Sequence, residues 1–310
     1  MERLDGSSAV PERLRGGIVA LGNFDGFHKG HQAVVGRAVA RARAEGRPAL
    51  VATFDPHPVR FFKPDLPPFR LTTLDQRQRL FAHAGADAML VFEFDKALCI
   101  TSAEDFVDDV LAQQIGAAGV VTGDDFTFGR GRKGNVETLR ELGQQSGIVA
   151  EAVAPVALGD LRISSGRIRE ALQAGETATA TKLMSRDYAI QGVVQAGDKR
   201  GRELGYPTAN IALGDYQRPR YGIYAVRATL EDGSEHPGVA SLGVRPTFDP
   251  PVELLETHLL DYDGDLYGQR IEVALHAFIR DEWKFDSVTQ LVDQMRDDEV
   301  DARRLLALPA

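Results

Sequence analysis

Two histidines, His28 and His31, stand three residues apart in a stretch near the N-terminus that also contains three glycines. The apolar run 18–21 predicts a strand before this stretch, and residues 32–45 predict a helix after it. The free N–H groups at the start of a helix, together with its dipole, favour an anion such as a phosphate. The histidines add donors beside that anion. A glycine-rich turn that only happens to carry two histidines remains the alternative for this layout.

Two further loops carry polar side chains at the carboxyl ends of predicted strands. Asp55 and His57 follow one strand, and Asp125 and Phe126 follow another, with three basic residues close behind. A basic loop at such an edge can hold an anionic ligand. A rigid or solvated surface turn remains the alternative explanation of each loop.

An arginine-rich segment opens another predicted helix. Ser164 or Ser165 is a candidate N-cap, and Arg162 and Arg169 lie on either side of the two serines. Capping alone would explain the serines, but three arginines within eight residues favour an anion or an exposed charged face. The loops together offer few candidates for a covalent nucleophile beside a general base. This inventory favours transfer at a phosphate by positioning and charge stabilisation.

The second half of the chain carries a separate polar set. Thr208 and Asn210 are two residues apart, so in an extended segment they face the same way. Two neutral oxygens with phosphates and water suit Mg²⁺, although a simple hydroxyl or Asx turn explains these residues equally well. Glu256 stands among apolar neighbours, where partial desolvation would make its carboxylate a better base. A Glu256 side chain that faces solvent remains open.

The elements that must position these residues differ between the two halves. In the first half, predicted strands alternate with helices of ten to fifteen residues, which indicates α/β architecture with a doubly wound parallel sheet. In the second half, short strands separated by turns predict a small antiparallel β-barrel, followed by a terminal helix. We place the domain boundary so that the two domains are 1–185 and 186–310.

Composition excludes several classes of protein. The chain has 310 residues, a net charge of −9 and one cysteine, Cys99. The acidic balance argues against nonspecific nucleic-acid binding, and one cysteine permits no disulfide framework. No apolar run is long enough for a transmembrane helix, and we see no signal peptide. We expect a cytoplasmic protein with no membrane association and no obligatory protein partner.

The order and spacing of the motifs resemble the bacterial bifunctional riboflavin kinase/FMN adenylyltransferase family, also called FAD synthetases. The first histidine stretch looks like the His-x-Gly-His signature of nucleotidyltransferases, with a Rossmann-like sheet. The segment 163–169 looks like the second ATP-phosphate motif of that superfamily. The segments 205–210, 221–224, 243–248 and 256–261 are similar to the flavokinase barrel. The resemblance covers about residues 15–308.

The resemblance implies that the C-terminal barrel transfers the γ-phosphate of ATP to the 5′-hydroxyl of riboflavin, giving FMN. Glu256 would be the base, and Thr208 and Asn210 would hold Mg²⁺. The residues implied in binding ATP in the kinase are Gly197, Lys199, Gly201, Gly205, Thr208 and Asn210.

The N-terminal domain would then join FMN to the α-phosphate of a second ATP, giving FAD and pyrophosphate. His28 and His31 would stabilise the charge that builds up at the α-phosphate. The implied ATP-binding residues are Gly22, Asn23, Phe24, Asp25, Gly26, His28, His31, Arg162, Ser164, Ser165 and Arg169. The implied flavin-binding residues are Asp55, His57, Asp125 and Phe126.

The chain departs from the family pattern at two places. Ser241-Leu242 stands where Asn-Ile is common, and Asn135 stands where an aspartate is common. Neither departure touches the residues implied in the chemistry. Two alternatives remain: an enzyme with only one active domain, and a flavin-binding sensor. Flavin products formed from riboflavin and ATP would separate the three hypotheses.

Overall fold

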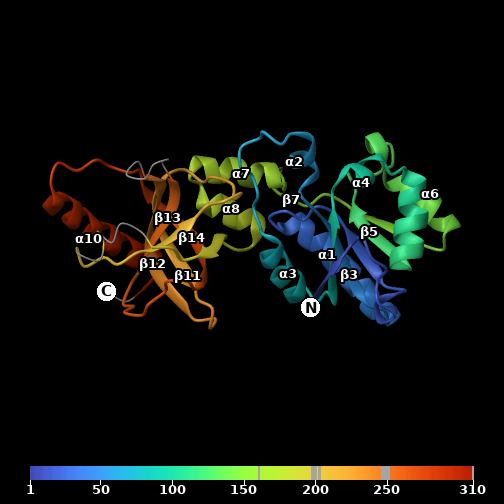
Figure 1. The fold of residues 1–310 in the computed structure, drawn as a ribbon, viewed down its shortest axis with the longest axis horizontal. Coiled ribbons are helices and arrows are strands. Elements are labelled where there is room, and N and C mark those ends of the chain that lie inside the picture. Colours follow the sequence, from blue (N-terminus) through green and yellow to red (C-terminus); the bar gives the residue numbers. More distant parts are fainter. Residues whose placement is uncertain (160, 197–200, 202–203, 246–251, 309–310) are drawn as a thin grey trace. The chain divides into compact units, whose positions relative to one another are not determined.

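The computed structural model describes residues 1–159, 161–196, 201, 204–245 and 252–308 (Figure 1). Its contacts divide the chain into two compact units, each with its own six-stranded sheet. The first unit comprises Met1–Pro67 and Thr73–Ser164, and the second comprises Pro68–Thr72 and Ser165–Ala310. The segment Pro68–Thr72 therefore belongs to the second unit, although the residues before and after it belong to the first.

The first unit contains a parallel sheet in the order β1-β4-β3-β2-β5-β6. Its strands are β1 (Glu2–Asp5), β2 (Ile18–Leu21), β3 (Ala49–Asp55), β4 (Ala88–Glu93), β5 (Gly119–Gly123) and β6 (Val149–Val153). All four residues of β2 are apolar and buried, as expected for a strand covered on both faces.

Helices cover both faces of this sheet, which confirms the predicted doubly wound fold. One face packs against α1 (Lys29–Glu45) and α3 (Leu74–His83), and the other packs against the π-helix η2 (Phe106–Ile115) and α6 (Val136–Gln145). The smaller elements of this unit are η1 (Glu12–Leu14), α2 (Pro58–Phe62), α4 (Lys96–Ile100), α5 (Ala103–Asp105), η3 (Arg130–Arg132), β7 (Ala157–Leu158) and β8 (Leu161–Arg162).

Local sequence explains where these helices begin. Thr73 caps α3 through a capping box, in which its hydroxyl accepts from the Gln76 N–H and the Gln76 side chain accepts from the Thr73 N–H. Asn135 caps α6 by accepting from the N–H of Thr138 at 3.0 Å. Asparagine is one of the best N-cap residues, so Asn135 suits this position without an aspartate.

The strand order creates a topological switch point at β2 and β5. The chain runs from β2 through β3 to β4 on one side, and then returns to place β5 and β6 on the other side. Ligands of such sheets bind beyond the carboxyl ends of the strands at this point. The loops that follow Leu21 and Gly123 leave the sheet there.

The second unit contains an antiparallel sheet in the order β10-β13-β12-β11-β14-β9. A bridge between Gln195 and Asn210 brings its two ends together, so the sheet forms a nearly closed barrel, as predicted. Its strands are β9 (Tyr188–Val193), β10 (Ala209–Ala212), β11 (Gly222–Thr229), β12 (Glu235–Arg245), β13 (Val252–Leu259) and β14 (Arg270–Arg280).

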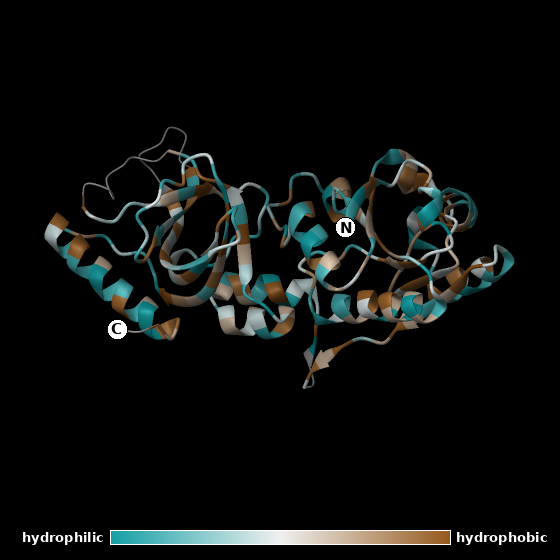
Figure 2. Ribbon diagram, turned by 90° about the horizontal axis from the view of Figure 1, so that it is seen from below, coloured by the Kyte–Doolittle hydropathy of each residue, from teal (hydrophilic) through white to brown (hydrophobic). Residues whose placement is uncertain are grey.

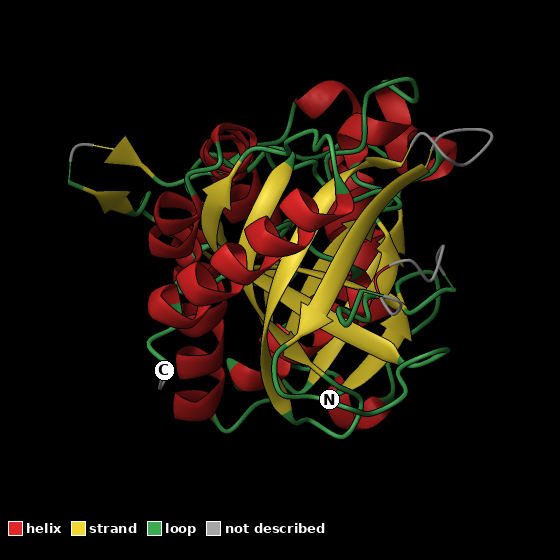
Figure 3. Cartoon of the chain, turned by 90° about the vertical axis from the view of Figure 1, so that its left-hand side faces the viewer, coloured by secondary structure: helices red, strands yellow, loops and turns green. Residues whose placement is uncertain are grey.

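Among the residues that the structure describes, three helices of eight or more residues belong to the unit of the barrel. They are α7 (Ser165–Ala174), α8 (Thr177–Met184) and the terminal α10 (Val288–Leu305). Helix α10 lies across the barrel strands (Figure 3), and hydrophobic and hydrophilic residues alternate along it (Figure 2). A buried bidentate ion pair between Arg280 and Asp298, at 2.7 and 2.5 Å, ties α10 to β14.

The structure adds strands that the sequence patterns did not indicate. β1 alternates exposed and half-buried residues and pairs only with β4, so it carries little apolar signal. β10 has four residues, which is too few for a clear alternation. Within the described ranges, no helix is both long and apolar enough to cross a membrane.

Candidate active sites

The loop that follows β2 has an unusual backbone. Phe24, Gly26 and Phe27 have φ values of 50°, 82° and 37°. Positive φ is costly for residues that carry a Cβ, so the surrounding structure must hold this conformation. The rings of Phe24 and Phe27 both pack edge-on against Phe81 of α3, with centroids 5.7 and 5.1 Å away. These aromatic contacts fix the loop on the face of the sheet.

The two histidines lie together at the start of α1. His28 is the N-cap, and its Nδ1 accepts from the backbone N–H of His31 at 3.2 Å. The two imidazole rings stack with centroids 3.6 Å apart, and Phe24 packs edge-on against His31. With Nδ1 acting as acceptor, the ring proton of neutral His28 is on Nε2. Both imidazoles therefore lie where the helix dipole favours an anion, as the sequence predicts.

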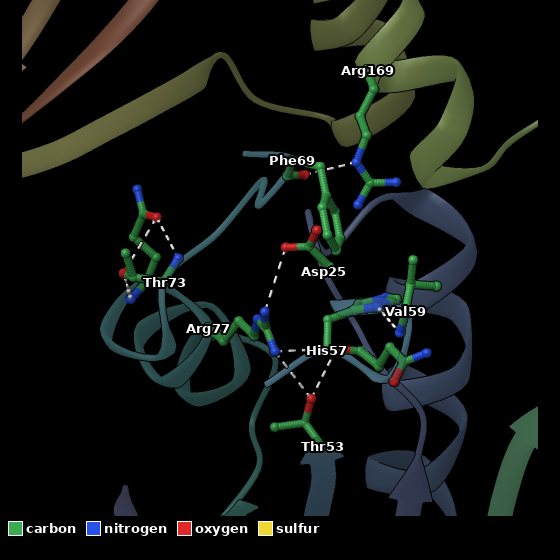
Figure 4. A network of polar contacts seen from close by, with 10 residues as sticks. Asp25, Thr53, His57, Val59, Phe69, Thr73, Arg77 and Arg169 are labelled. Atoms are coloured by element: carbon green, nitrogen blue, oxygen red, sulfur yellow. Dashed lines mark hydrogen bonds and ion pairs between the residues drawn. The ribbon is translucent and has the colours of Figure 1, made fainter. Parts of the chain in front are cut away.

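A buried arginine of α3 forms hydrogen bonds with the same loop (Figure 4). Arg77 of α3 is 1% exposed, and its guanidinium donates to the carbonyl of Asn23 at 3.3 Å and to Asp25 at 3.5 Å. It also contacts the hydroxyl of Thr53 at 3.3 Å, which in turn donates to the Asn23 carbonyl at 2.8 Å. Asp25 is as buried as its partner, so the two charges form an ion pair away from solvent.

Arg77 and Thr53 were not among the residues predicted from the sequence. A signal for Arg77 existed, because in α3 the residues Leu74, Arg77 and Phe81 share one helical stripe. A charged residue in the middle of an apolar stripe must find a buried partner. Its partner could not be identified from the sequence, since Asp25 lies 52 positions away.

The other predicted residues of the first unit lie at the same edge of the sheet. Asp55 ends β3, and His57 caps α2 through Nδ1, which accepts from the N–H of Val59 at 3.2 Å. Arg162 donates to Asp125 at 2.6 Å, so a predicted phosphate-binding residue and a predicted flavin-binding residue are in direct contact. Both side chains of this ion pair are exposed.

The remaining residues of the second ATP-phosphate motif are divided between the two units. Ser164 closes the first unit, and Ser165 begins α7 in the second, which leaves Ser164 at the N-cap position. Within the second unit, Arg169 of α7 donates to the carbonyl of Phe69 at 2.8 Å. Its guanidinium also lies over the Phe69 ring, 5.1 Å from the centroid.

Phe126 belongs to the edge of the core as well as to the candidate site. Its ring stacks on Phe128 with centroids 5.8 Å apart, and Phe128 packs on Phe106 of η2. This half-buried ring presents an apolar surface directly after β5, at the switch point. Planar aromatic ligands stack well on such a surface.

In the barrel, strand register places the predicted kinase residues side by side. Asn210 of β10 is directly opposite Glu256 of β13, and Glu256 is opposite Ser241 of β12. Opposite residues of antiparallel strands share a face, so these three side chains form a row. The Ser241 hydroxyl donates to Glu282 at 3.2 Å, which gives this departure from the family pattern a local role.

A pocket opens next to this row. Thr208, Asn210 and Thr257 line it together with Tyr262 and Tyr267 from the turn after β13. Glu256 itself is not in the wall described, but its chain neighbour Thr257 is. The Oδ1 atom of Asn210 is buried, and no described residue forms a hydrogen bond with it.

These donors fit a magnesium ion. Mg²⁺ binds few protein ligands and keeps water and substrate phosphates in its shell. Asn210 Oδ1 is a buried neutral oxygen to which no described residue donates, and Thr208 lines the same pocket, so the two residues meet that requirement. Among the described residues no cluster of three or more acidic, cysteine or histidine side chains offers an alternative metal site.

The loop before Thr208 needs its glycines. A Cβ at Gly201 would lie 2.3 Å from the carbonyl oxygen of Tyr206, and Gly205 has a φ of 88°. The loop is attached to β13 because the carbonyl of Pro207 lies 2.9 Å from Nδ1 of His258. Two further predicted residues of this loop, Gly197 and Lys199, lie outside the described residues.

The comparisons with known proteins match both halves of the chain. The family model for FAD synthetase matches residues 10–167, and the family model for riboflavin kinase matches residues 184–306. The bifunctional riboflavin kinase/FMN adenylyltransferase of Escherichia coli strain K12 is 37% identical over 94% of each chain. This chain belongs to the bifunctional riboflavin kinase/FMN adenylyltransferase family.

A second relative and a solved structure match nearly the whole chain. The bifunctional riboflavin kinase/FMN adenylyltransferase of Pseudomonas fluorescens is 40% identical over 100% of this chain and 99% of its own length. A solved structure described as a macrolide-efflux protein from Streptococcus pneumoniae superimposes with a TM-score of 0.86 at 32% identity. It covers 97% of this chain and 98% of that chain, so the fold is shared over the full length.

Proposed function

We propose that this chain makes FAD from riboflavin in two ATP-dependent steps, with the kinase in the C-terminal domain and the adenylyltransferase in the N-terminal domain. The observation that supports this most strongly is the co-occurrence of both family matches, in this order, on one chain. We assign the first activity to residues 186–310 and the second to residues 1–185.

In the kinase step, the 5′-hydroxyl of riboflavin attacks the γ-phosphorus of ATP, and ADP leaves. Glu256 accepts the hydroxyl proton, so the attacking oxygen becomes more nucleophilic as the bond forms. Glu256 is half-buried and lies directly opposite Asn210, which we assign as a ligand of the metal. This position supports its role as the base. The glycines of the loop before Thr208 allow the backbone to approach the ATP phosphates.

Thr208 and Asn210 would hold Mg²⁺ through their side-chain oxygens. When bound, the ion neutralises charge on the phosphates during transfer. Asn210 Oδ1, buried and without a partner among the described residues, supports this assignment.

In the adenylyltransferase step, a phosphate oxygen of FMN attacks the α-phosphorus of a second ATP, and pyrophosphate leaves. FMN is itself the nucleophile, so the protein needs to supply only positioning and charge stabilisation. His28 and His31 stabilise the charge on the α-phosphate, aided by the N-terminus of α1. Arg162, together with Ser164, binds the leaving pyrophosphate.

The rest of this site follows the family pattern. The phosphates of ATP are also bound by Ser165 and Arg169. The flavin is contacted by Asp55, His57, Asp125 and Phe126. We propose a cytoplasmic enzyme that needs no protein partner, because both steps use ATP and small molecules.

Incubation with riboflavin, ATP and Mg²⁺, followed by chromatographic separation of the flavins, tests the proposal. We expect FMN to appear first and FAD to follow, and chelation of the metal with EDTA to stop both. FMN that accumulates without FAD would contradict the adenylyltransferase assignment. Tight riboflavin binding without any product would instead indicate a flavin sensor.

A further inference from the structure

We propose that Arg77 is a positioning residue of the adenylyltransferase. It does not touch the substrates; it holds the backbone and the carboxylate of the loop between β2 and α1 in the conformation that presents His28. This inference rests on the proposed adenylyltransferase activity of the N-terminal domain.

The contacts of Arg77 converge on that loop. Its Nη1 donates to the carbonyl of Asn23 and its Nη2 to the carboxylate of Asp25, so one planar group spans two consecutive parts of the loop. The Thr53 hydroxyl donates to the same Asn23 carbonyl from β3. The loop is therefore attached to the sheet on one side and to α3 on the other, as Figure 4 shows.

The loop needs this support because its backbone is strained. Phe24 and Phe27 both have positive φ, which is unfavourable for a residue with a Cβ and persists only where the surrounding structure holds it. Phe24 lies between the two acceptors of the guanidinium, Asn23 and Asp25. If the guanidinium is lost, the peptide at Phe24 can relax, and the start of α1 can shift with it.

A small shift at this point affects the chemistry directly. His28 follows Asp25 by only three residues, and its Nδ1 caps α1. A displacement of about 1 Å in a positioning element can lower a rate by about a hundredfold. Arg77 thus contributes to catalysis through geometry, although it is buried at 1% exposure.

The geometry also distinguishes Arg77 from a residue that only stabilises the core. A lysine at this position would keep the positive charge beside Asp25. A single ammonium group cannot reproduce the planar fork that reaches two separate acceptors. In Arg77→Lys the loop therefore loses one of its two contacts with the side chain at position 77. The substitution still leaves a positive charge to pair with buried Asp25.

The test measures kcat and KM for FAD formation from FMN and ATP in Arg77→Lys, and riboflavin phosphorylation in the same preparation. We expect FAD formation to fall about tenfold or more, mainly in kcat, while FMN formation stays at the wild-type rate. Arg79→Lys, an exposed position on the same helix, is the matched control and should leave both activities unchanged.

Thr53→Val tests the same proposal independently of whether the Arg77→Lys variant folds. It removes the other donor to the Asn23 carbonyl, so it should also lower FAD formation and spare FMN formation. The two substitutions should be non-additive in kcat, because they act on one carbonyl. Wild-type kcat in Arg77→Lys, or fully additive effects in the double variant, would overturn the proposal. A wild-type protein that makes no FAD would instead refute the proposed function.

Discussion

We assign two roles to the imidazole ring of His28. Its Nδ1 accepts from the backbone N–H of His31 at the start of α1, and we propose that its Nε2 donates to a phosphate of ATP. The cap fixes the direction in which Nε2 points, so the first role sets the geometry of the second. Protonation of Nδ1 would remove the acceptor and break the cap.

The two roles of His28 can be separated by substitution. Asparagine is a good N-cap, but it has no donor where Nε2 lies. We expect His28→Asn to keep the thermal midpoint of the wild type and to lose FAD formation by about 10²–10³-fold. His28→Ala should lose activity equally and also about 1 kcal/mol of stability. Calorimetry and flavin chromatography on both variants check this, and an active asparagine variant would contradict it.

At the residue scale, the sequence indicated candidate binding and catalytic residues, but it did not indicate the residues that hold their loop in place. His28 and His31 were recognisable because they stand in a glycine-rich turn after an apolar run. Arg77 and Thr53 were not, because their contacts with the loop join segments 30 to 54 positions apart. The sequence indicates that a buried polar side chain needs a partner, but only the fold shows which residue that partner is.

At the scale of elements, strand register determines which residues of the proposed kinase site are neighbours. Asn210 and Glu256 are neighbours only because β10 pairs with β13, and a shift by one residue would put Glu256 on the other face. The sequence indicated a barrel from its short strands and turns. It could not indicate this pairing, since β10 has only four residues and the pairing is long-range.

A second polar cluster attaches β13 to the connection between β10 and β11. Arg218 donates to Glu253 at 2.9 and 2.6 Å, and the Tyr221 hydroxyl donates to the same carboxylate. The hydrogen bond from Arg218 is the main reason why the pKa of Glu253 is lowered from its ordinary value of 4.5. Burial is the main reason why the pKa of Tyr221 is raised to about 12, and the Glu253 carboxylate adds to this.

This cluster predicts how stability depends on pH. Because the folded pKa of Glu253 is depressed, its contribution is fully present above 4.5 and is lost as pH falls through the lower folded value. Glu253→Gln should therefore lower the thermal midpoint at neutral pH, and the difference from wild type should shrink in acid. Glu235→Gln, at an exposed position, is the control. A difference that does not change with pH would contradict this account.

At the scale of the whole molecule, two chemistries share one chain without sharing their proposed catalytic residues. His28 and His31 lie at the start of α1 in the first unit, and Glu256 lies on β13 of the barrel in the second. Relatives that match over 94% or more of this chain are named after both activities. The product of the barrel, FMN, is the substrate of the other domain. Because the proposed catalytic residues differ, we expect that a substitution in one site leaves the other site active.

Complementation between two inactive variants tests this account most directly. Glu256→Ala and His31→Ala are each incubated with riboflavin, ATP and Mg²⁺, alone and mixed, and the flavins are separated. We predict no product from Glu256→Ala, FMN alone from His31→Ala, and FAD from the mixture. A mixture that stops at FMN, or a His31→Ala variant that makes neither flavin, would contradict two independent active sites on this chain.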